Sequence, residues 1–113
     1  IQSKHPLADF VLGDRDGTTC EPAFVDLVEQ ELKARGYTVA RNNPYKGVQL
    51  IARIGQPAHQ RHSMQVEIRR PVYMDEASLR PSANYGRLKA DLRDLTAALI
   101  DWLHGRLAQR SPA

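Results

Sequence analysis

In the segment Met64–Arg70, apolar and polar side chains alternate, a pattern typical of a β-strand with one buried face. Successive strand side chains face opposite sides of a sheet, so the two faces differ in polarity. The apolar face carries Met64, Val66 and Ile68, and the polar face carries Gln65, Glu67 and Arg69. Pro71 cannot donate a ladder hydrogen bond, so we expect the strand to end before it. The polar face is either a solvated surface or a place for chemistry, since open α/β sheets bind ligands at the carboxyl ends of their strands.

Two further segments are expected to be strands. Ala8–Gly13 contains a short apolar run closed by glycine, which is typical of a buried strand of a parallel sheet. Tyr37–Arg41 predicts a second strand, parallel or antiparallel to the first. The period of Val48–Ile54 does not decide between a short helix and an irregular apolar segment.

Two amphipathic helices complete the pattern. The first is predicted to begin at Glu21-Pro22 and to end at Gly36, because proline suits the first helical position and glycine suits a left-handed C-terminal cap. The second, longer helix is predicted to begin near Ser82 or Asn84, both of which are good N-cap residues. Strands that alternate with amphipathic helices predict an α/β fold. We expect both helices to pack on the sheet and the Glu67 strand to lie near its centre.

Charge and cysteine content narrow the class of protein. The net charge of +3 comes from 16 basic and 13 acidic residues that are dispersed along the chain, so no basic stripe indicates nucleic-acid binding. Cys20 is the only cysteine, which excludes an internal disulfide and agrees with a reducing cytoplasm. No apolar run approaches the ~20 residues of a membrane span. We therefore expect neither a nucleic-acid partner nor a membrane partner.

Four groups of residues, taken in order, resemble the signature of the N-formylglutamate amidohydrolase (N-formylglutamate deformylase) family. The matching residues are Asp9–Arg15 with Gly17–Cys20; Asn43–Gly47; Arg53 with Gly55 and Pro57; and His62 followed by Gln65, Glu67, Arg70 and Tyr73–Glu76. The resemblance runs from about Asp9 to Leu103. Several short motifs in the right order are more specific than any one of them alone.

The resemblance implies a fold for the whole domain and a place for this chain within that domain. The family is similar to zinc carboxypeptidases and to the aspartoacylase group. It therefore implies part of a three-layer α/β/α domain with a mixed sheet, of the phosphorylase/hydrolase-like (zinc carboxypeptidase-like) type. The chain begins at Ile1 and is shorter than the family's catalytic domain. We expect residues 1–113 to form the C-terminal portion of a single domain whose N-terminal portion is missing from this chain, and the chain alone to be incomplete and inactive.

The resemblance also implies an activity. It is the metal-dependent hydrolysis of the amide of N-formyl-L-glutamate to L-glutamate and formate, a step of histidine degradation in the cytoplasm. Glu67 falls where the family's general base would be, beside a zinc-bound water. The zinc ligands are expected upstream of Ile1, so this chain is predicted to supply none. His59 and His62 do not have a zinc-site spacing.

The substrate would be a small anionic N-acyl amino acid. Arg53 and Arg70 are candidates for binding its carboxylates, because the planar guanidinium bonds a carboxylate at two points. Asn43, Tyr45 and Lys46 could line the same pocket from their loop. His62 either supports the residues of the site, contacts the substrate or is a plain loop histidine. Two alternatives stay open: a related N-acyl amino acid amidohydrolase, and a catalytically silent fragment that docks onto a partner such as its own missing N-terminal half.

Overall fold

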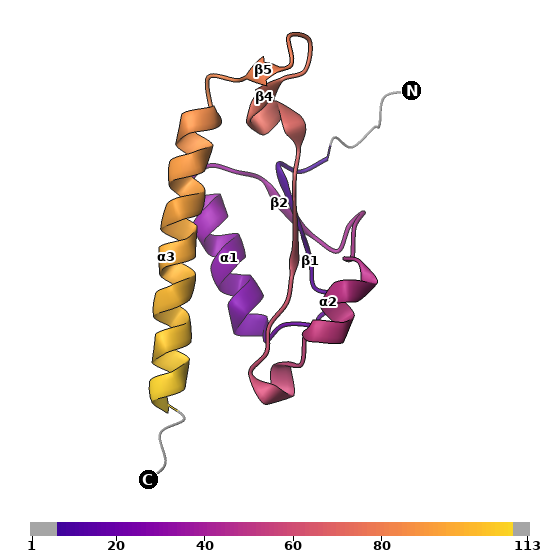
Figure 1. Ribbon diagram of the computed structural model, residues 1–113, viewed down its shortest axis with the longest axis vertical. Helices are drawn as coiled ribbons and strands as arrows, with labels where there is room; N and C mark the ends of the chain where they lie inside the picture. The colour runs from indigo at the N-terminus through magenta and orange to yellow at the C-terminus, as the bar shows by residue number, and fades with distance from the viewer. Residues whose placement is uncertain (1–6, 110–113) are drawn as a thin grey trace.

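Strand β1 (Phe10–Gly13) forms the centre of a mixed sheet in the computed structural model, which describes residues 7–109. The sheet has the order β2-β1-β3, where β2 is Val39–Arg41 and β3 is Gln65–Ile68 (Figure 1). Strand β1 runs parallel to β2 and antiparallel to β3. The expectation of a parallel sheet around β1 therefore holds on one side only, and the protein is a mixed α/β domain.

The prediction that the Glu67 strand lies near the sheet centre is wrong for the described residues. Strand β3 has a single neighbour and forms an edge of the three-stranded sheet. The central place belongs to β1, all of whose residues are buried because its run is apolar throughout. The alternation in Met64–Arg70 instead suits a strand that has only one covered face. Strand β3 ends at Ile68, and a 3₁₀ turn over Arg70–Val72 begins just before Pro71.

Helix α1 (Pro22–Ala34) begins and ends where Pro22 and Gly36 predict. Pro22 occupies the first turn, and Gly36 has a left-handed φ of 92°. The Tyr37 N–H donates to the Leu32 carbonyl, and the Gly36 N–H donates to the Lys33 carbonyl. These two hydrogen bonds form a Schellman motif, which satisfies carbonyls at the end of the helix and turns the chain toward β2.

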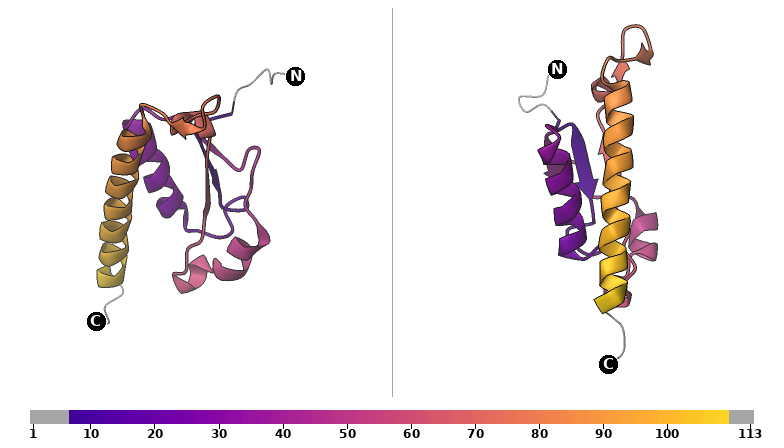
Figure 2. Two further views of the ribbon diagram at one scale, coloured as in Figure 1. Left: turned by 45° about the horizontal axis from the view of Figure 1, so that its top comes forward. Right: turned by 90° about the vertical axis from the view of Figure 1, so that its left-hand side faces the viewer.

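Helix α3 (Tyr85–Gln109) lies beside α1, and both cover the same face of the sheet (Figures 1 and 2). Asn84 immediately precedes α3, as predicted, and its carbonyl accepts the Leu88 N–H. Phe10 and Leu12 of β1 are fully buried against the two helices. The other buried residues of this core are Cys20, Val25, Val28, Leu32, Tyr37, Val72, Leu88 and Leu95.

The opposite face of β1 is covered by a loop and a short helix. The ambiguous segment after Gly47 forms helix α2 (Gln49–Ile54), and its Ile51 is buried. Gly13 lies so close to the loop that an added Cβ would stand 2.7 Å from the Lys46 carbonyl carbon. This contact fixes the loop that carries Tyr45 against the sheet.

The Gly13 contact gives a stability prediction. Gly13→Ala should lower the free energy of unfolding by about 1–3 kcal/mol, because a methyl group is forced against backbone atoms that cannot rotate away. The matched control is Gly105→Ala in α3, where nothing lies within 4 Å of an added Cβ. That change should raise stability by about 0.5–1 kcal/mol, the helix preference for alanine over glycine. Urea denaturation measures both, and an unchanged midpoint for Gly13→Ala would contradict the packing.

The connection between β3 and α3 is more structured than its polar composition suggests. Strands β4 (Met74–Asp75) and β5 (Arg80–Pro81) pair as a short antiparallel hairpin. A 3₁₀ turn, Pro57–His59, precedes β3. Among the described residues, no helix combines the length and the apolar character needed to cross a membrane.

Candidate active site

Glu67 lies on the face of β3 that points away from α1 and α3. Its register partner in β1 is Val11, whereas Ile68 pairs with Phe10 of the helix-covered face. The Gln65 amide donates to the Glu67 Oε1 at 2.9 Å, and the Gln65 Oε1 accepts the Val48 N–H at 3.1 Å. These hydrogen bonds orient the Glu67 carboxylate while leaving it exposed.

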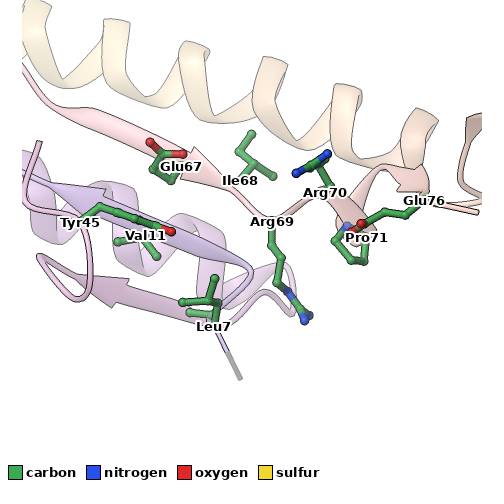
Figure 3. Close-up of a pocket in the computed structure, with 10 residues that line it drawn as sticks. Leu7, Val11, Tyr45, Glu67, Ile68, Arg69, Arg70, Pro71 and Glu76 are labelled. Atoms are coloured by element: carbon green, nitrogen blue, oxygen red, sulfur yellow. The ribbon is translucent and has the colours of Figure 1, made fainter. Parts of the chain in front are cut away.

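A cavity of about 330 Å³ adjoins Glu67 at the carboxyl end of β3. It is lined by Leu7, Ala8, Val11, Tyr45, Glu67, Ile68, Arg69, Arg70, Pro71 and Glu76. Figure 3 shows the Tyr45 ring lying over Val11, and the Arg70 and Arg69 side chains leaving the chain in different directions. Two carboxylates and two guanidinium groups therefore share one small cavity, which suits an anionic substrate that needs a proton acceptor nearby.

The two arginines that line the cavity differ in whether their guanidinium group has an ion-pair partner. The Arg69 guanidinium pairs with Asp9 at 3.2 Å. Burial alone would raise the pKa of the Asp9 carboxyl, but hydrogen bonds from Thr38 and Arg69 outweigh it, and the pKa is lowered. Arg69 is thus committed to a structural ion pair. Arg70 has no ion-pair partner within residues 7–109, so its charge is available to a ligand.

Three of the residues predicted from sequence meet in this cavity: Glu67, Arg70 and Tyr45. Two others are exposed and do not line it. Arg53 lies in the last turn of α2, and Asn43 lies in the preceding loop. Lys46, from the same loop, pairs with Asp16 at 2.9 Å. Arg69 and Glu76 also line the cavity but are not among the site residues that the sequence predicts, although Glu76 belongs to the matching segment Tyr73–Glu76.

His62 occupies a different environment from the one a substrate contact requires. Only 4% of its side chain is exposed. Its ring stacks on Phe24 with centroids 5.1 Å apart and meets Trp102 edge-on at 5.6 Å. Its Nδ1 accepts the Glu21 N–H at 3.1 Å. The structure therefore gives His62 a packing role at the junction of α1 and α3, and its contact with a substrate stays a prediction.

Asp14 and Asn42 hold the loop that follows β1. The Asn42 amide donates to the Asp14 Oδ1 at 2.7 Å, and the Gly17 N–H donates to the same oxygen at 2.9 Å. Asp14 is 5% exposed. The Asp14 carboxylate is therefore a cap of the turn that follows β1.

The described residues do not by themselves fit a zinc ion. Within residues 7–109, no group of three or more His, Cys, Asp or Glu side chains is placed to hold a metal. The buried Nε2 of His62 faces Glu21 at 3.8 Å inside the aromatic cluster, not the cavity beside Glu67. That the zinc ligands come from polypeptide upstream of Ile1 stays a prediction.

The His62 environment predicts how stability depends on pH. Burial lowers the pKa of His62 below its usual value. Because Nδ1 accepts a hydrogen bond, the native ring is neutral, and the unfolded chain binds a proton more readily than the native one. The free energy of unfolding should therefore fall as pH decreases through the ordinary histidine range, from about 7 to 5.

Urea denaturation at several pH values checks this expectation. The control is His62→Asn, whose Oδ1 can replace Nδ1 as the acceptor but does not titrate. Its stability should change less with pH over the same interval. Equal pH dependence in the parent and the variant would show that another group is responsible.

The fold and the cavity define a mixed α/β domain that presents a strand carboxylate beside an arginine. Residues 1–74 match the profile of the N-formylglutamate amidohydrolase family. The chain belongs to this family.

Individual relatives agree with the match. The chain is 34% identical over 107 residues to an N-formylglutamate deformylase of Pseudomonas aeruginosa, covering 90% of this chain and 40% of the relative. A Pseudomonas putida N-formylglutamate deformylase is 32% identical over 71 residues, which cover 62% of this chain and 27% of the relative. The crystal structure of N-formylglutamate amidohydrolase from Ralstonia eutropha JMP134 is 60% identical, with a TM-score of 0.85, and the match covers 92% of this chain and 38% of that one. The chain thus spans well under half the length of these relatives.

Proposed function

We propose that this chain contributes Glu67 and Arg70 to an enzyme that hydrolyses N-formyl-L-glutamate to L-glutamate and formate. The observation that carries the proposal is that both side chains line one cavity at the carboxyl end of β3. The names of the relatives support the choice of substrate. They do not favour the alternative of a catalytically silent docking module.

Glu67 is assigned the role of general base. Its carboxylate is exposed to the cavity, and Gln65 holds one of its oxygens. It would take a proton from the attacking water as the oxygen bonds to the formyl carbon. When the carbon–nitrogen bond breaks, the same carboxyl group would return the proton to the departing amine. One carboxyl group can therefore serve both proton transfers.

Arg70 is assigned the role of binding a substrate carboxylate. Its planar guanidinium can bond both carboxylate oxygens, which favours an acidic side chain over its amide. Tyr45 would form the wall of the cavity beside it. Arg53, Asn43 and His62 do not line this cavity, so we assign them no substrate contact.

Further features of the enzyme belong to the same proposal and come from the family resemblance. Zinc would be held by ligands outside the described residues and would supply Lewis-acid polarisation. Polypeptide that precedes this chain in the family would complete a three-layer α/β/α domain, of which residues 1–113 form the C-terminal portion. The reaction would serve histidine degradation in the cytoplasm.

A substrate comparison tests the proposal in a full-length protein. The Ralstonia eutropha relative, with its matched part replaced by residues 1–113, is a suitable chimera because the two share 60% identity and one fold. It should release formate from N-formyl-L-glutamate with a much higher kcat/KM than from N-formyl-L-glutamine, which lacks the side-chain charge. Equal kcat/KM values would contradict recognition of a second carboxylate.

A further inference from the structure

Gln65 lies two residues before Glu67 on β3, so both side chains leave the same face of the strand. The Gln65 Nε2 donates to the Glu67 Oε1 at 2.9 Å. Gln65 itself does not line the cavity that adjoins Glu67. Any influence of Gln65 on a bound substrate therefore passes through the Glu67 carboxylate.

The orientation of the Gln65 side-chain amide is set by a backbone donor. The Val48 N–H donates to the Gln65 Oε1 at 3.1 Å. A backbone N–H can only donate, so it selects the oxygen of the amide and turns the NH₂ group toward Glu67. The reverse orientation would place two donors face to face at Val48 and two acceptors face to face at Glu67. In this arrangement Gln65 can only donate to the carboxylate.

The loop that precedes Val48 is a firm anchor for this bridge. The Arg15 N–H donates to the Lys46 carbonyl at 2.8 Å, and the Arg15 Nη1 donates to the Gly47 carbonyl at 3.0 Å. Gly47 has a φ of 108°, which glycine adopts without steric cost. Gly13 of β1 also packs closely against the backbone of Lys46 and Gly47. Because the anchor is fixed, the Gln65 amide is fixed, and it holds the carboxylate in one place.

The two oxygens of the Glu67 carboxylate consequently differ. Oε1 accepts the Gln65 N–H, whereas Oε2 accepts no hydrogen bond from residues 7–109. We propose that Gln65 is a positioning residue, which holds Oε1 and thereby presents Oε2 as the atom that takes the proton of the attacking water. The inference rests on the proposed function, in which Glu67 is the general base. A base acts only when its accepting atom is within hydrogen-bond reach of the proton, and a further group that orients the base secures that geometry.

The kinetics of two Gln65 variants in the chimera test this role. Gln65→Leu removes both hydrogen bonds. It should lower kcat by about 10-fold and change KM by less than about twofold, because the base is misplaced while the cavity lining is intact. Gln65→Glu keeps an acceptor for the Val48 N–H but replaces the donor to Glu67 with a second carboxylate oxygen, so its kcat should fall at least as far.

Gln65→Glu is the decisive variant, because it separates orientation of Glu67 from attachment of the loop. A kcat near that of the unmodified chimera would overturn the proposal, since the contact with Val48 alone would then account for Gln65. The matched control is Gln49→Glu, which makes the same chemical change at an exposed position of α2 outside the cavity lining. This control should leave kcat unchanged.

A double variant shows whether Gln65 acts through Glu67. Glu67→Gln removes the base, so adding Gln65→Leu to it should lower kcat by less than about twofold more, because the two residues act as one unit. A further loss as large as that of Gln65→Leu alone would mean that Gln65 affects the reaction independently of Glu67, and would overturn the proposal.

The side-chain amide resonances of Gln65 in the chimera report the contact without turnover. They should move when Glu67→Gln removes the charged acceptor and stay in place in Gln49→Glu, and unmoved resonances in Glu67→Gln would overturn the proposal. An inactive chimera, or a Glu67→Gln variant with normal turnover, would refute the proposed function and the positioning role that rests on it. Loss of turnover in Glu67→Gln with normal turnover in Gln65→Leu would refute the positioning role alone.

Discussion

Glu67→Gln in the chimera is expected to lower kcat by a factor of about 10² to 10⁴, the usual contribution of a positioned general base. Glutamine keeps the shape of the side chain but cannot accept the proton of the attacking water. KM should change little, because the interaction is made in the transition state. Steady-state formate release measures both constants.

The matched control for this variant is Glu76→Gln, which neutralises the other carboxylate that lines the cavity. It should reduce kcat far less, since Glu76 has no assigned role in proton transfer. If Glu67→Gln kept near-normal turnover and Glu76→Gln lost it, the general base would be Glu76, and the assignment made from the family position would be wrong.

Arg70→Ala should raise KM for N-formyl-L-glutamate by roughly 10- to 150-fold, which corresponds to the 1.5–3 kcal/mol of a hydrogen bond to a charged group. Arg70→Lys should give an intermediate KM, because an ammonium group cannot bond a carboxylate with a planar fork. Initial rates over a range of substrate concentrations check both variants.

Arg69→Ala is the control for the arginine assignment. Arg69 is held by Asp9, so its loss should lower stability and leave KM nearly unchanged. A large rise in KM for Arg69→Ala, together with an unchanged KM for Arg70→Ala, would show that Arg69 and not Arg70 binds the substrate carboxylate.

Local signals in the sequence predicted the secondary structure well. Pro22 and Gly36 mark the ends of α1 because each acts through its own backbone geometry. The alternation around Glu67 likewise predicted a strand and the face on which the carboxylate lies. These features depend on neighbouring residues, so a single sequence contains the information.

Features that depend on distant contacts were harder to predict. Nothing in the Glu67 strand itself indicates that β1 has neighbours on both sides while β3 has one. The place of His62 in a motif groups it with the site residues, but its ring is enclosed by Phe24 and Trp102, which come from two different helices. Arg53 and Arg70 look alike in sequence, and only the three-dimensional path of the chain separates them.

Formate release by the chimera measures directly whether Glu67 and Arg70 belong to a deformylase site. The chimera should turn over N-formyl-L-glutamate repeatedly and release one formate for each L-glutamate formed. Glu67→Gln and Arg70→Ala should each impair this turnover in a chimera that remains folded. A chimera that folds with the circular dichroism spectrum and melting behaviour of its Ralstonia eutropha parent, yet releases no formate under conditions in which the parent does, would contradict the claim that these residues form a deformylase site.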